Sequence, residues 1–254
     1  MASCSEDMEP WEAATLTVED YSSSLSAAGG SFTLDIETNT VWRIDAPEWV
    51  TVDPASGEGN AVVTVTVQPN IPVAPESNER RERVVLMAGY ENGEELVGNI
   101  AGCQTHDVWI SQAGAFDDFV CNVGNAAFTR TTEEVWDEEQ QQNVRHDSYN
   151  GVATYTIDSW LSNEQLASIF GEVDIRFVCL YRVYDSHGRY ETYERECFRM
   201  PVEWEKGEHD LTVSFDLYDD YIMRSVSTQF VERGTETRIP FSSGLYYEEI
   251  ETVE

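Results

Sequence analysis

Apolar and polar residues alternate in short runs along most of this 254-residue chain. Every second residue is apolar in residues 32–36 and 63–67, and again in residues 153–157 and 211–217. Successive side chains of a β-strand point to opposite faces of the sheet, so this period predicts strands with one buried face. Turn signals such as Ala28-Gly29-Gly30 separate the runs. Short strands at this spacing predict an all-β protein built from β-sandwiches.

The first half of the chain also carries an ordered series of sequence blocks. They are Leu25–Gly30, Trp42–Ile44, Trp49–Asn60, Val63–Val67 and Ile110–Gly114. In these blocks the segment 14–114 resembles the BACON domain (Bacteroidetes-associated carbohydrate-binding, often N-terminal). The resemblance implies an immunoglobulin-like β-sandwich on a secreted or surface protein of that bacterial group. It also implies either sugar binding or a spacer role, and we expect Trp42 and Trp49 to contribute to the core.

The second half, residues 115–254, resembles no family that we recognise, and its strand patterns predict a second β-sandwich of Ig-like or jelly-roll topology. Residues 173–184 and 189–200 form the clearest hairpin, around the turn Asp185-Ser186-His187-Gly188. The polar segment 132–149 is interpreted as a long loop or a hairpin tip.

One short helix is expected within this second domain, over residues 163–170. Ser162 is a good N-cap, and Gln165 completes a capping box with it. Leu161 and Leu166 have the spacing of a hydrophobic staple, and Gly171 stands where a helix-ending glycine is favoured. These signals place the helix beside a sheet edge.

The N-terminal leader, residues 1–13, begins Met1-Ala2-Ser3-Cys4, and small residues before a cysteine are similar to a lipobox. This interpretation predicts lipidation of Cys4, with the exported protein anchored by lipid at the cell surface of the outer membrane. Stable anchoring requires more than one acyl chain. The alternative is that Met1 is the true start, that Cys4 is an ordinary thiol and that the protein is cytoplasmic.

Cys103, Cys121, Cys179 and Cys197 remain once Cys4 is set aside. An even number of cysteines in an exported protein permits disulfides. Cys179 and Cys197 lie on the two arms of the predicted hairpin and are candidates for one bridge, which would leave the other two cysteines for a second. The alternative is that all four are reduced thiols.

The chain is strongly acidic in both halves, with 48 acidic residues against 15 Lys and Arg and a formal net charge of −33. Binding to nucleic acid requires a basic surface, and so does electrostatic docking on an anionic membrane, so both are disfavoured. The same charge favours neutral over anionic glycans. The expected partner is therefore a glycan or a surface protein, with membrane contact only through the lipid anchor.

Catalytic motifs are missing from the sequence, which has no Gly-x-Ser-x-Gly, His-Glu-x-x-His or phosphate-binding loop. Pairs of acidic residues occur, as they must by chance in so acidic a chain. Cys103 and His106 lack a second ligand pair for zinc, and Asp216, Asp219 and Asp220 lack the periodicity of a calcium loop. We therefore expect a protein that is not an enzyme and uses no metal or cofactor.

A sugar-binding protein stacks pyranose rings on exposed aromatic side chains that have polar neighbours. Trp136 and Tyr149 fall outside the alternation that predicts the core, and Trp160 and Trp204 lie at the ends of predicted elements. Each is a candidate platform, and packing is the alternative role for each. The favoured hypothesis is a non-catalytic surface lipoprotein that binds a neutral glycan, with the BACON-like domain as spacer. The alternative is a structural or adhesin-type protein-interaction module, and the ligand and the oligomeric state stay open.

Overall fold

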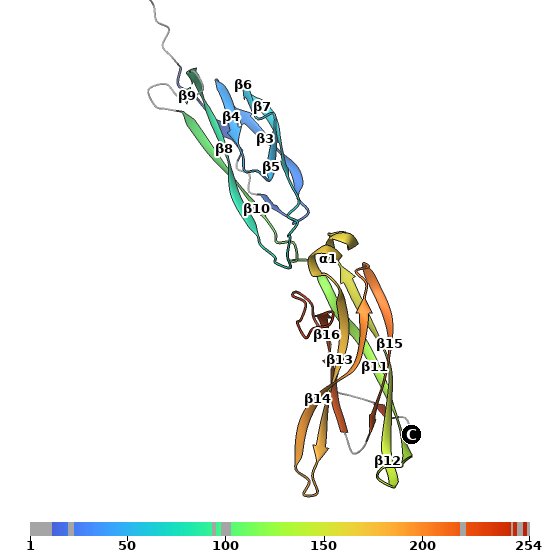
Figure 1. The fold of residues 1–254 in the computed structure, drawn as a ribbon. Coiled ribbons are helices and arrows are strands. Elements are labelled where there is room, and N and C mark those ends of the chain that lie inside the picture. Colours follow the sequence, from blue (N-terminus) through green and yellow to red (C-terminus); the bar gives the residue numbers. More distant parts are fainter. Residues whose placement is uncertain are drawn as a thin grey trace, which may run out of the picture. The chain divides into compact units, whose positions relative to one another are not determined.

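The computed structural model describes residues 12–19, 23–92, 95–97, 103–218, 222–244, 246–247 and 251–252. Within these residues the chain is built almost entirely of β-strands, so the expected all-β class is confirmed (Figure 1). It divides into two compact units. The first comprises Met1–Ile71 with Ser77–Asp117, and the second comprises Pro72–Glu76 with Asp118–Glu254.

Two sheets form the sandwich of the first unit. One has the order β1 (Thr17–Val18), β3 (Gly30–Glu37), β7 (Ala61–Val67) and β5 (Val50–Asp53). The other has the order β2 (Ser23–Leu25), β10 (Gln104–Gln112), β8 (Arg80–Asn92), β4 (Val41–Asp45) and β6 (Ser56–Glu58), with β9 (Glu95–Val97) paired to β8. Both sheets contribute side chains to one hydrophobic core.

The core of the first unit follows the alternation in the sequence. Val63, Val65 and Val67 are buried, whereas Thr64 and Thr66 between them are exposed. Removing such a side chain from water stabilises the fold by about 1.5–3 kcal/mol. Trp42 is also buried, and its indole Nε1 donates a hydrogen bond to the carbonyl oxygen of Gly59 at 3.0 Å. The expected structural role of Trp42 is thus confirmed.

A second pair of sheets forms the sandwich of the second unit. One sheet has the order β15 (Gly207–Tyr218), β12 (Gln142–Asp158), β11 (Val120–Asp137) and β18 (Glu251–Thr252). The other has the order β14 (Tyr190–Val202), β13 (Val173–Tyr184), β16 (Ile222–Glu232) and β17 (Tyr246–Tyr247). Rings from both sheets meet in the core, where Phe128 of β11 contacts Phe177 of β13 edge to face at 6.3 Å.

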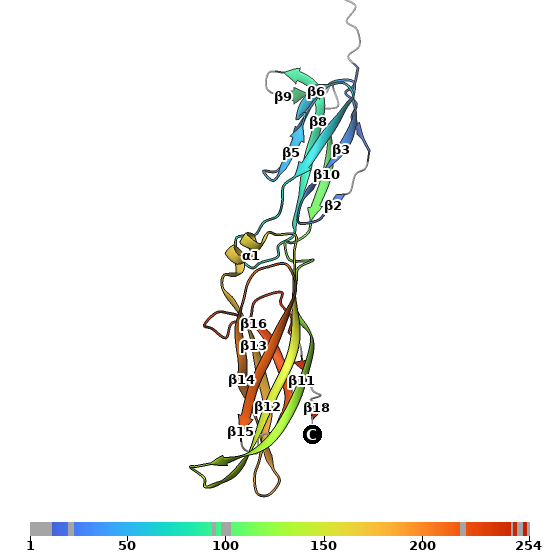
Figure 2. The same cartoon turned by 90° about the vertical axis from the view of Figure 1, so that its right-hand side faces the viewer.

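The segment 132–149 is a regular hairpin and not a long loop. β11 and β12 pair without interruption from Thr131 opposite Ser148 to Asp137 opposite Gln142. Thr and Val residues favour the pleated surface, and the ladder satisfies backbone groups that a loop would leave to water. This hairpin and the β13–β14 hairpin both end on the side of the second unit opposite α1 (Figures 1 and 2).

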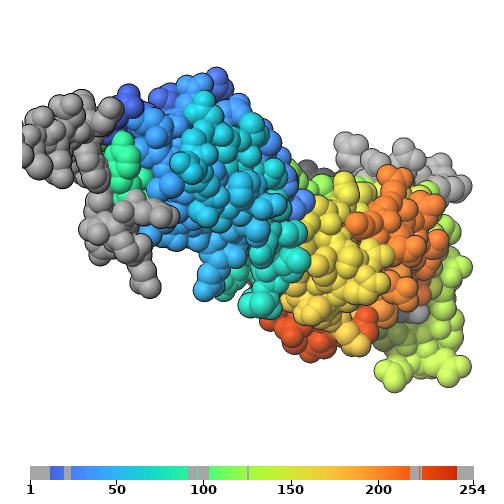
Figure 3. All heavy atoms as spheres, turned by 90° about the horizontal axis from the view of Figure 1, so that it is seen from above, coloured from blue at the N-terminus to red at the C-terminus, as the bar shows by residue number. Residues whose placement is uncertain are grey.

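The expected helix is present as α1, Asn163–Phe170. The Ser162 hydroxyl accepts a hydrogen bond from the Gln165 backbone N–H at 3.2 Å, and the Gln165 side chain accepts one from the Ser162 N–H at 2.8 Å. Leu161 and Leu166 are buried, while the opposite side of the helix lies at the surface in the yellow region of Figure 3. Within the described residues no helix is long and apolar enough to cross a membrane.

Candidate ligand-binding site on a tyrosine ribbon

The free end of the β13–β14 hairpin is organised by the side chain of Asp185. Its Oδ1 accepts hydrogen bonds from the backbone N–H groups of His187 at 2.8 Å and Arg189 at 2.9 Å. Gly188 has φ +75°, a conformation that favours glycine because it has no Cβ. The backbone hydrogen bond from Arg189, together with those from His187 and the Arg189 side chain, outweighs desolvation and lowers the pKa of Asp185. The carboxylate form of Asp185 therefore fixes the turn.

Four tyrosines lie in two cross-strand pairs next to this turn, and we call them the tyrosine ribbon. Tyr184 pairs with Tyr190 and Tyr181 pairs with Tyr193 in the β-ladder. The ring centroids are 5.5 Å apart in the first pair and 5.8 Å apart in the second. Tyr184, Tyr190 and Tyr193 are 37%, 50% and 43% exposed, so these rings do not belong to the core.

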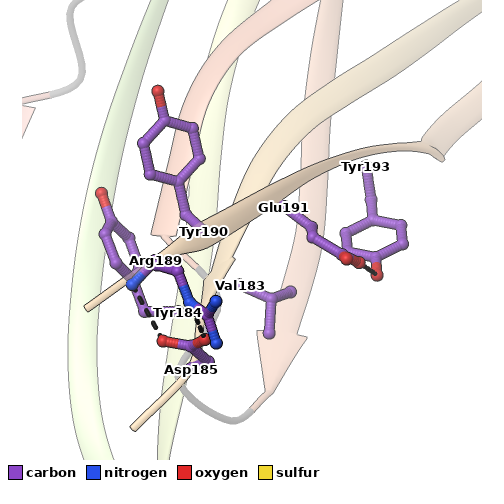
Figure 4. Close-up of a pocket in the computed structure, with 7 residues that line it drawn as sticks. All are labelled: Val183, Tyr184, Asp185, Arg189, Tyr190, Glu191 and Tyr193. Carbon is purple, nitrogen blue, oxygen red and sulfur yellow. Dashed lines mark hydrogen bonds and ion pairs between the residues drawn. The ribbon is translucent and has the colours of Figure 1, made fainter. Parts of the chain in front are cut away.

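An open pocket of about 500 Å³ is formed at the tyrosine ribbon. Its lining residues are Val183, Tyr184, Asp185, Arg189, Tyr190, Glu191 and Tyr193. Figure 4 shows Tyr184 and Tyr190 beside the Asp185–Arg189 pair, while Glu191 and Tyr193 lie together further along β14. Successive strand residues point to opposite faces, so Tyr184 and Tyr190 share one face of the hairpin, while Glu191 and Tyr193 lie on the other. On the first face, apolar ring surfaces adjoin the hydrogen-bonding groups of Asp185 and Arg189 at the turn, as the general design of a small-ligand site requires.

Charged groups of both signs lie around the tyrosine ribbon. Arg189 Nε lies 2.9 Å from Asp185 Oδ2, and the guanidinium of Arg182 stacks over the Tyr190 ring at 4.2 Å from its centroid. The Tyr193 hydroxyl donates a hydrogen bond to Glu191. The pocket lining itself holds two carboxylates, Asp185 and Glu191, and one guanidinium, Arg189, so it carries charges of both signs although the whole chain is strongly negative. Such a surface suits a neutral ligand rich in hydroxyl groups.

Trp136 is exposed, as a binding platform has to be, but it lies outside the pocket. Its side chain is 56% exposed near the end of the β11–β12 hairpin, next to Val135, which is also exposed. The neighbouring turn is held by Asp137, whose Oδ1 accepts hydrogen bonds from the backbone N–H groups of Glu139 and Gln140. The structure does not bring Trp136 together with the other candidate residues.

Tyr149 is buried, which corrects its placement as a candidate platform. Only 1% of the residue is exposed, and its ring stacks on Phe215 with centroids 5.0 Å apart. The segment before it is a strand and not a loop. The buried, inward-facing residues of β12 therefore continue back from Ile157 through Tyr155 and Ala153 to Tyr149. A buried ring offers no face to a sugar.

Trp204 is likewise a packing residue. It is buried, stacks on Phe170 at 5.0 Å, and donates a hydrogen bond from its Nε1 to the Gly171 carbonyl oxygen at 2.9 Å. It therefore fixes the end of α1. Trp160 is half-buried just before that helix and is not part of the pocket lining. Neither residue shares a site with Trp136.

The four described cysteines are free thiols. The hairpin expected between Cys179 and Cys197 is present, but the register pairs Cys179 with Arg195, and Cys197 occupies a bulge in β14. Cys4 lies outside the described residues, as do Asp219 and Asp220. Within the described residues no group of three or more His, Cys, Asp or Glu side chains is arranged to hold a metal ion.

The tyrosine ribbon was missed in the sequence, although a signal for it was present. Tyr184 and Tyr190 are equally spaced about the turn centred on His187, as are Tyr181 and Tyr193. Folding the predicted hairpin about this turn would have paired them. What the sequence does not show is that β13 and β14 continue past Arg182, the last residue of β13 that pairs with β16, so that the Tyr184–Tyr190 pair lies on the two-stranded part of the hairpin.

The first unit is the part of the chain for which comparison with known proteins gives a family. Residues 16–113 match the BACON family model, described as "Putative binding domain, N-terminal". This finding confirms the resemblance noted in the sequence. A search of the curated proteins finds no match.

Three solved structures are similar to parts or most of the chain, at low identity. "Bacteroides ovatus GH5 xyloglucanase in complex with a XXXG heptasaccharide" is 18% identical, with 43% of this chain and 21% of that chain covered and a TM-score of 0.29. A protein of unknown function from Porphyromonas gingivalis W83 is 9% identical, covers 94% and 99%, and has a TM-score of 0.25. Squid arrestin is 6% identical, covers 94% and 98%, and has a TM-score of 0.20. This chain thus spans about a fifth of the xyloglucanase chain.

The BACON unit has a pocket of its own, with different chemistry. It measures about 600 Å³ and is lined by Thr17, Glu19, Asp35, Ile36, Glu37, Asn60, Ala61 and Val62. The lining contains three carboxylates and no aromatic ring. A pyranose ring would find no stacking surface there, so the tyrosine ribbon of the second unit is the better candidate site.

Proposed function

We propose that this protein is a non-catalytic glycan-binding protein whose second unit holds a neutral saccharide on the tyrosine ribbon. The observation that carries the proposal is the pocket in which the exposed rings of Tyr184 and Tyr190 adjoin Asp185 and Arg189. Pyranose rings would stack on Tyr184 and Tyr190, and the charged side chains would bond the hydroxyl groups. No bond is made or broken in this mechanism.

The BACON unit serves as the spacer in this proposal, and the protein is exported and lipid-anchored through Cys4. The match of residues 16–113 to a family of binding domains supports a binding protein in general. The Ala2-Ser3-Cys4 pattern supports the anchor. A spacer would hold the tyrosine ribbon away from the membrane, where polysaccharides are accessible.

A glycan array probed with the full-length chain tests the proposal, followed by calorimetric titration of each bound glycan. Tyr190→Ala should weaken binding about tenfold, which corresponds to about 1.4 kcal/mol and is typical for an aromatic contact residue. Trp109→Ala is the matched control, because Trp109 is an equally exposed aromatic residue (48%) in the BACON unit. Absence of binding to any glycan, or equal affinities for wild type and Tyr190→Ala, would overturn the proposal.

A second candidate function is a protein-interaction module, which the exposed Val135 and Trp136 favour. The two side chains point to opposite faces of the hairpin, and an exposed aromatic ring such as Trp136 is suited to a protein contact as well as to a sugar. Trp136→Ala separates the two functions in the same array. Loss of glycan binding in Trp136→Ala but not in Tyr190→Ala would place the sugar at the β11–β12 hairpin. Capture of a defined surface protein that requires Trp136, without glycan binding, would favour the module.

A further inference from the structure

Cys179 and Cys197 lie on the neighbouring strands from which the tyrosine ribbon projects. The ladder passes from Phe177 opposite Phe198 to Val178 opposite Glu196, so β14 has one additional residue, Cys197, at this position. A β-bulge of this kind changes the direction of a side chain relative to a regular strand. The sequence alone, with a regular register, would not show where the Cys197 side chain points.

The bulge brings the Cys197 thiol to the part of β13 that carries Cys179. Cys197 Sγ donates a hydrogen bond to the Phe177 carbonyl oxygen at 3.3 Å, two residues before Cys179. Cys179 is fully buried and Cys197 is half-buried. The hydrogen bond with the Cys197 thiol, together with burial, raises the pKa of Cys179 strongly. The Cys197 thiol therefore lies against β13 two residues from Cys179.

We propose that Cys179 and Cys197 form an intrachain disulfide, at the base of the tyrosine ribbon, when the protein meets an oxidising disulfide. The oxidant is a disulfide-bonded compound such as an oxidised dithiol protein or oxidised glutathione. The inference does not depend on the proposed glycan binding, because it rests on the two strands alone.

The reaction proceeds in two exchange steps. The Cys197 thiolate attacks the oxidant's disulfide, forms a mixed disulfide and releases one oxidant thiol. Cys179 then attacks Cys197 Sγ and passes its proton to the departing sulfur of the oxidant, which leaves as the second oxidant thiol. The two cysteines together lose two protons and two electrons, and the oxidant's disulfide is reduced to two thiols. Cys197 reacts first because it is the less buried of the two cysteines, and a buried thiol is rarely ionised.

The bridge would close a loop that contains Tyr181, Tyr184, Tyr190 and Tyr193. Arg182 is the last residue of β13 that pairs with β16, so the hairpin end beyond it has two strands. A two-stranded hairpin is only marginally stable in water, and a disulfide restricts the open conformations of the segment it encloses. Oxidation would therefore hold β13 and β14 together within the sheet, before the two-stranded end begins, and would restrict the relative position of the tyrosine pairs.

Refolding of the full-length chain in a glutathione redox buffer, followed by alkylation in denaturant and peptide mapping by mass spectrometry, tests the inference. We expect Cys179 and Cys197 in one linked peptide pair, lighter by two hydrogen atoms than the reduced peptides, with Cys103 and Cys121 alkylated. Alkylation of both Cys179 and Cys197, or their linkage to other cysteines, would overturn it.

A trypsin digest gives an independent readout, because Arg189 lies between the two cysteines at the exposed turn. Oxidised protein cut only at Arg189 should migrate as one species without reductant and as two fragments with it. Cys197→Ser should give two fragments in both conditions, and the matched variant Cys103→Ser should behave like wild type. Two fragments from oxidised wild type without reductant would contradict the bridge.

Discussion

Tyr149 stacks on Phe215 with ring centroids 5.0 Å apart and an interplanar angle of 11°, across the neighbouring strands β12 and β15. The Tyr149 hydroxyl donates a hydrogen bond of 3.4 Å to the buried carboxylate of Asp147. Burial, followed by the charge of Asp147, raises the pKa of Tyr149 to about 12. This tyrosine is thus a neutral core residue with its hydroxyl among buried polar groups.

Replacement of Tyr149 should affect stability and not ligand binding. We expect Tyr149→Ala to lower the free energy of unfolding of the second unit by about 3–5 kcal/mol, as for other large aromatic residues removed from a core. Tyr149→Phe keeps the ring and loses only a long hydrogen bond, so it should cost about 1 kcal/mol. Urea unfolding followed by circular dichroism measures both. Equal stabilities for the Ala and Phe variants would contradict the packing role.

Two glycines of the β11–β12 sheet form a matched pair for a packing prediction. A Cβ added at Gly151 would lie 2.4 Å from the Phe128 ring and 2.6 Å from the Ala127 carbonyl oxygen. A Cβ at Gly124 would meet only Thr154 Oγ1, at 3.9 Å. Gly151→Ala should therefore destabilise the protein by about 1–3 kcal/mol through overpacking. Gly124→Ala should change stability by less than about 0.5 kcal/mol. Similar thermal unfolding midpoints for the two variants would refute this difference.

The buried carboxylate of Asp147 should make the second unit sensitive to acid. Burial alone would raise its pKa, but hydrogen bonds from Arg145 and Thr132 and the charge of Arg145 outweigh burial and lower the pKa. A lowered pKa in the folded state gives stability that is complete above the unfolded value of about 3.9. That stability is lost as the pH falls below this value toward the pKa of the folded state.

Asp147→Asn tests this pH dependence. The variant should be less stable than wild type at pH 7, because Arg145 loses its charged partner, and the difference should shrink below about pH 4. Urea unfolding at several pH values measures it. Since Glu139 forms no part of this cluster and is exposed in the β11–β12 turn, Glu139→Gln is a suitable control and should follow the wild-type curve. A constant difference between Asp147→Asn and wild type across the pH range would contradict the role of the carboxylate.

The fold could be predicted where local signals decide it. The helix α1 was expected at its observed residues, because the Ser162–Gln165 capping box and the Leu161–Leu166 staple act within one helical turn. The alternation of buried and exposed residues around Val65 could likewise be predicted, because it depends only on neighbouring residues and on one face of the strand being buried. The alternation of buried and exposed residues in β12 could also have been followed back to Tyr149. The polar residues before Tyr149 suggested a loop instead.

The candidate site depended on relations that a local pattern does not contain. Tyr190 is exposed because the β13–β14 hairpin extends beyond the sandwich, and this depends on where the strands of both sheets end. The direction of Cys197 depends on a bulge whose position is not evident from the residues themselves. Trp204 was placed as a candidate platform because its packing partners, Phe119 and Phe170, are distant in sequence.

The turn at Asp185 should control ligand binding through its hydrogen bonds to the backbone. Asp185→Ala removes the acceptor for the N–H groups of His187 and Arg189, so the strand ends should separate and the Tyr184–Tyr190 pair should lose its geometry. Asp185→Asn keeps one side-chain oxygen, which can accept the same hydrogen bonds, as Asn commonly does in turns. We expect Asp185→Ala to weaken glycan binding by about tenfold, corresponding to about 1.4 kcal/mol, and Asp185→Asn to retain most of the affinity.

Because the turn lies outside the core, both variants should unfold within about 0.5 kcal/mol of wild type. Calorimetric titration of the same glycan against the three proteins measures the affinities, and equal affinities for Asp185→Ala and wild type would show that the turn does not position the tyrosines for binding.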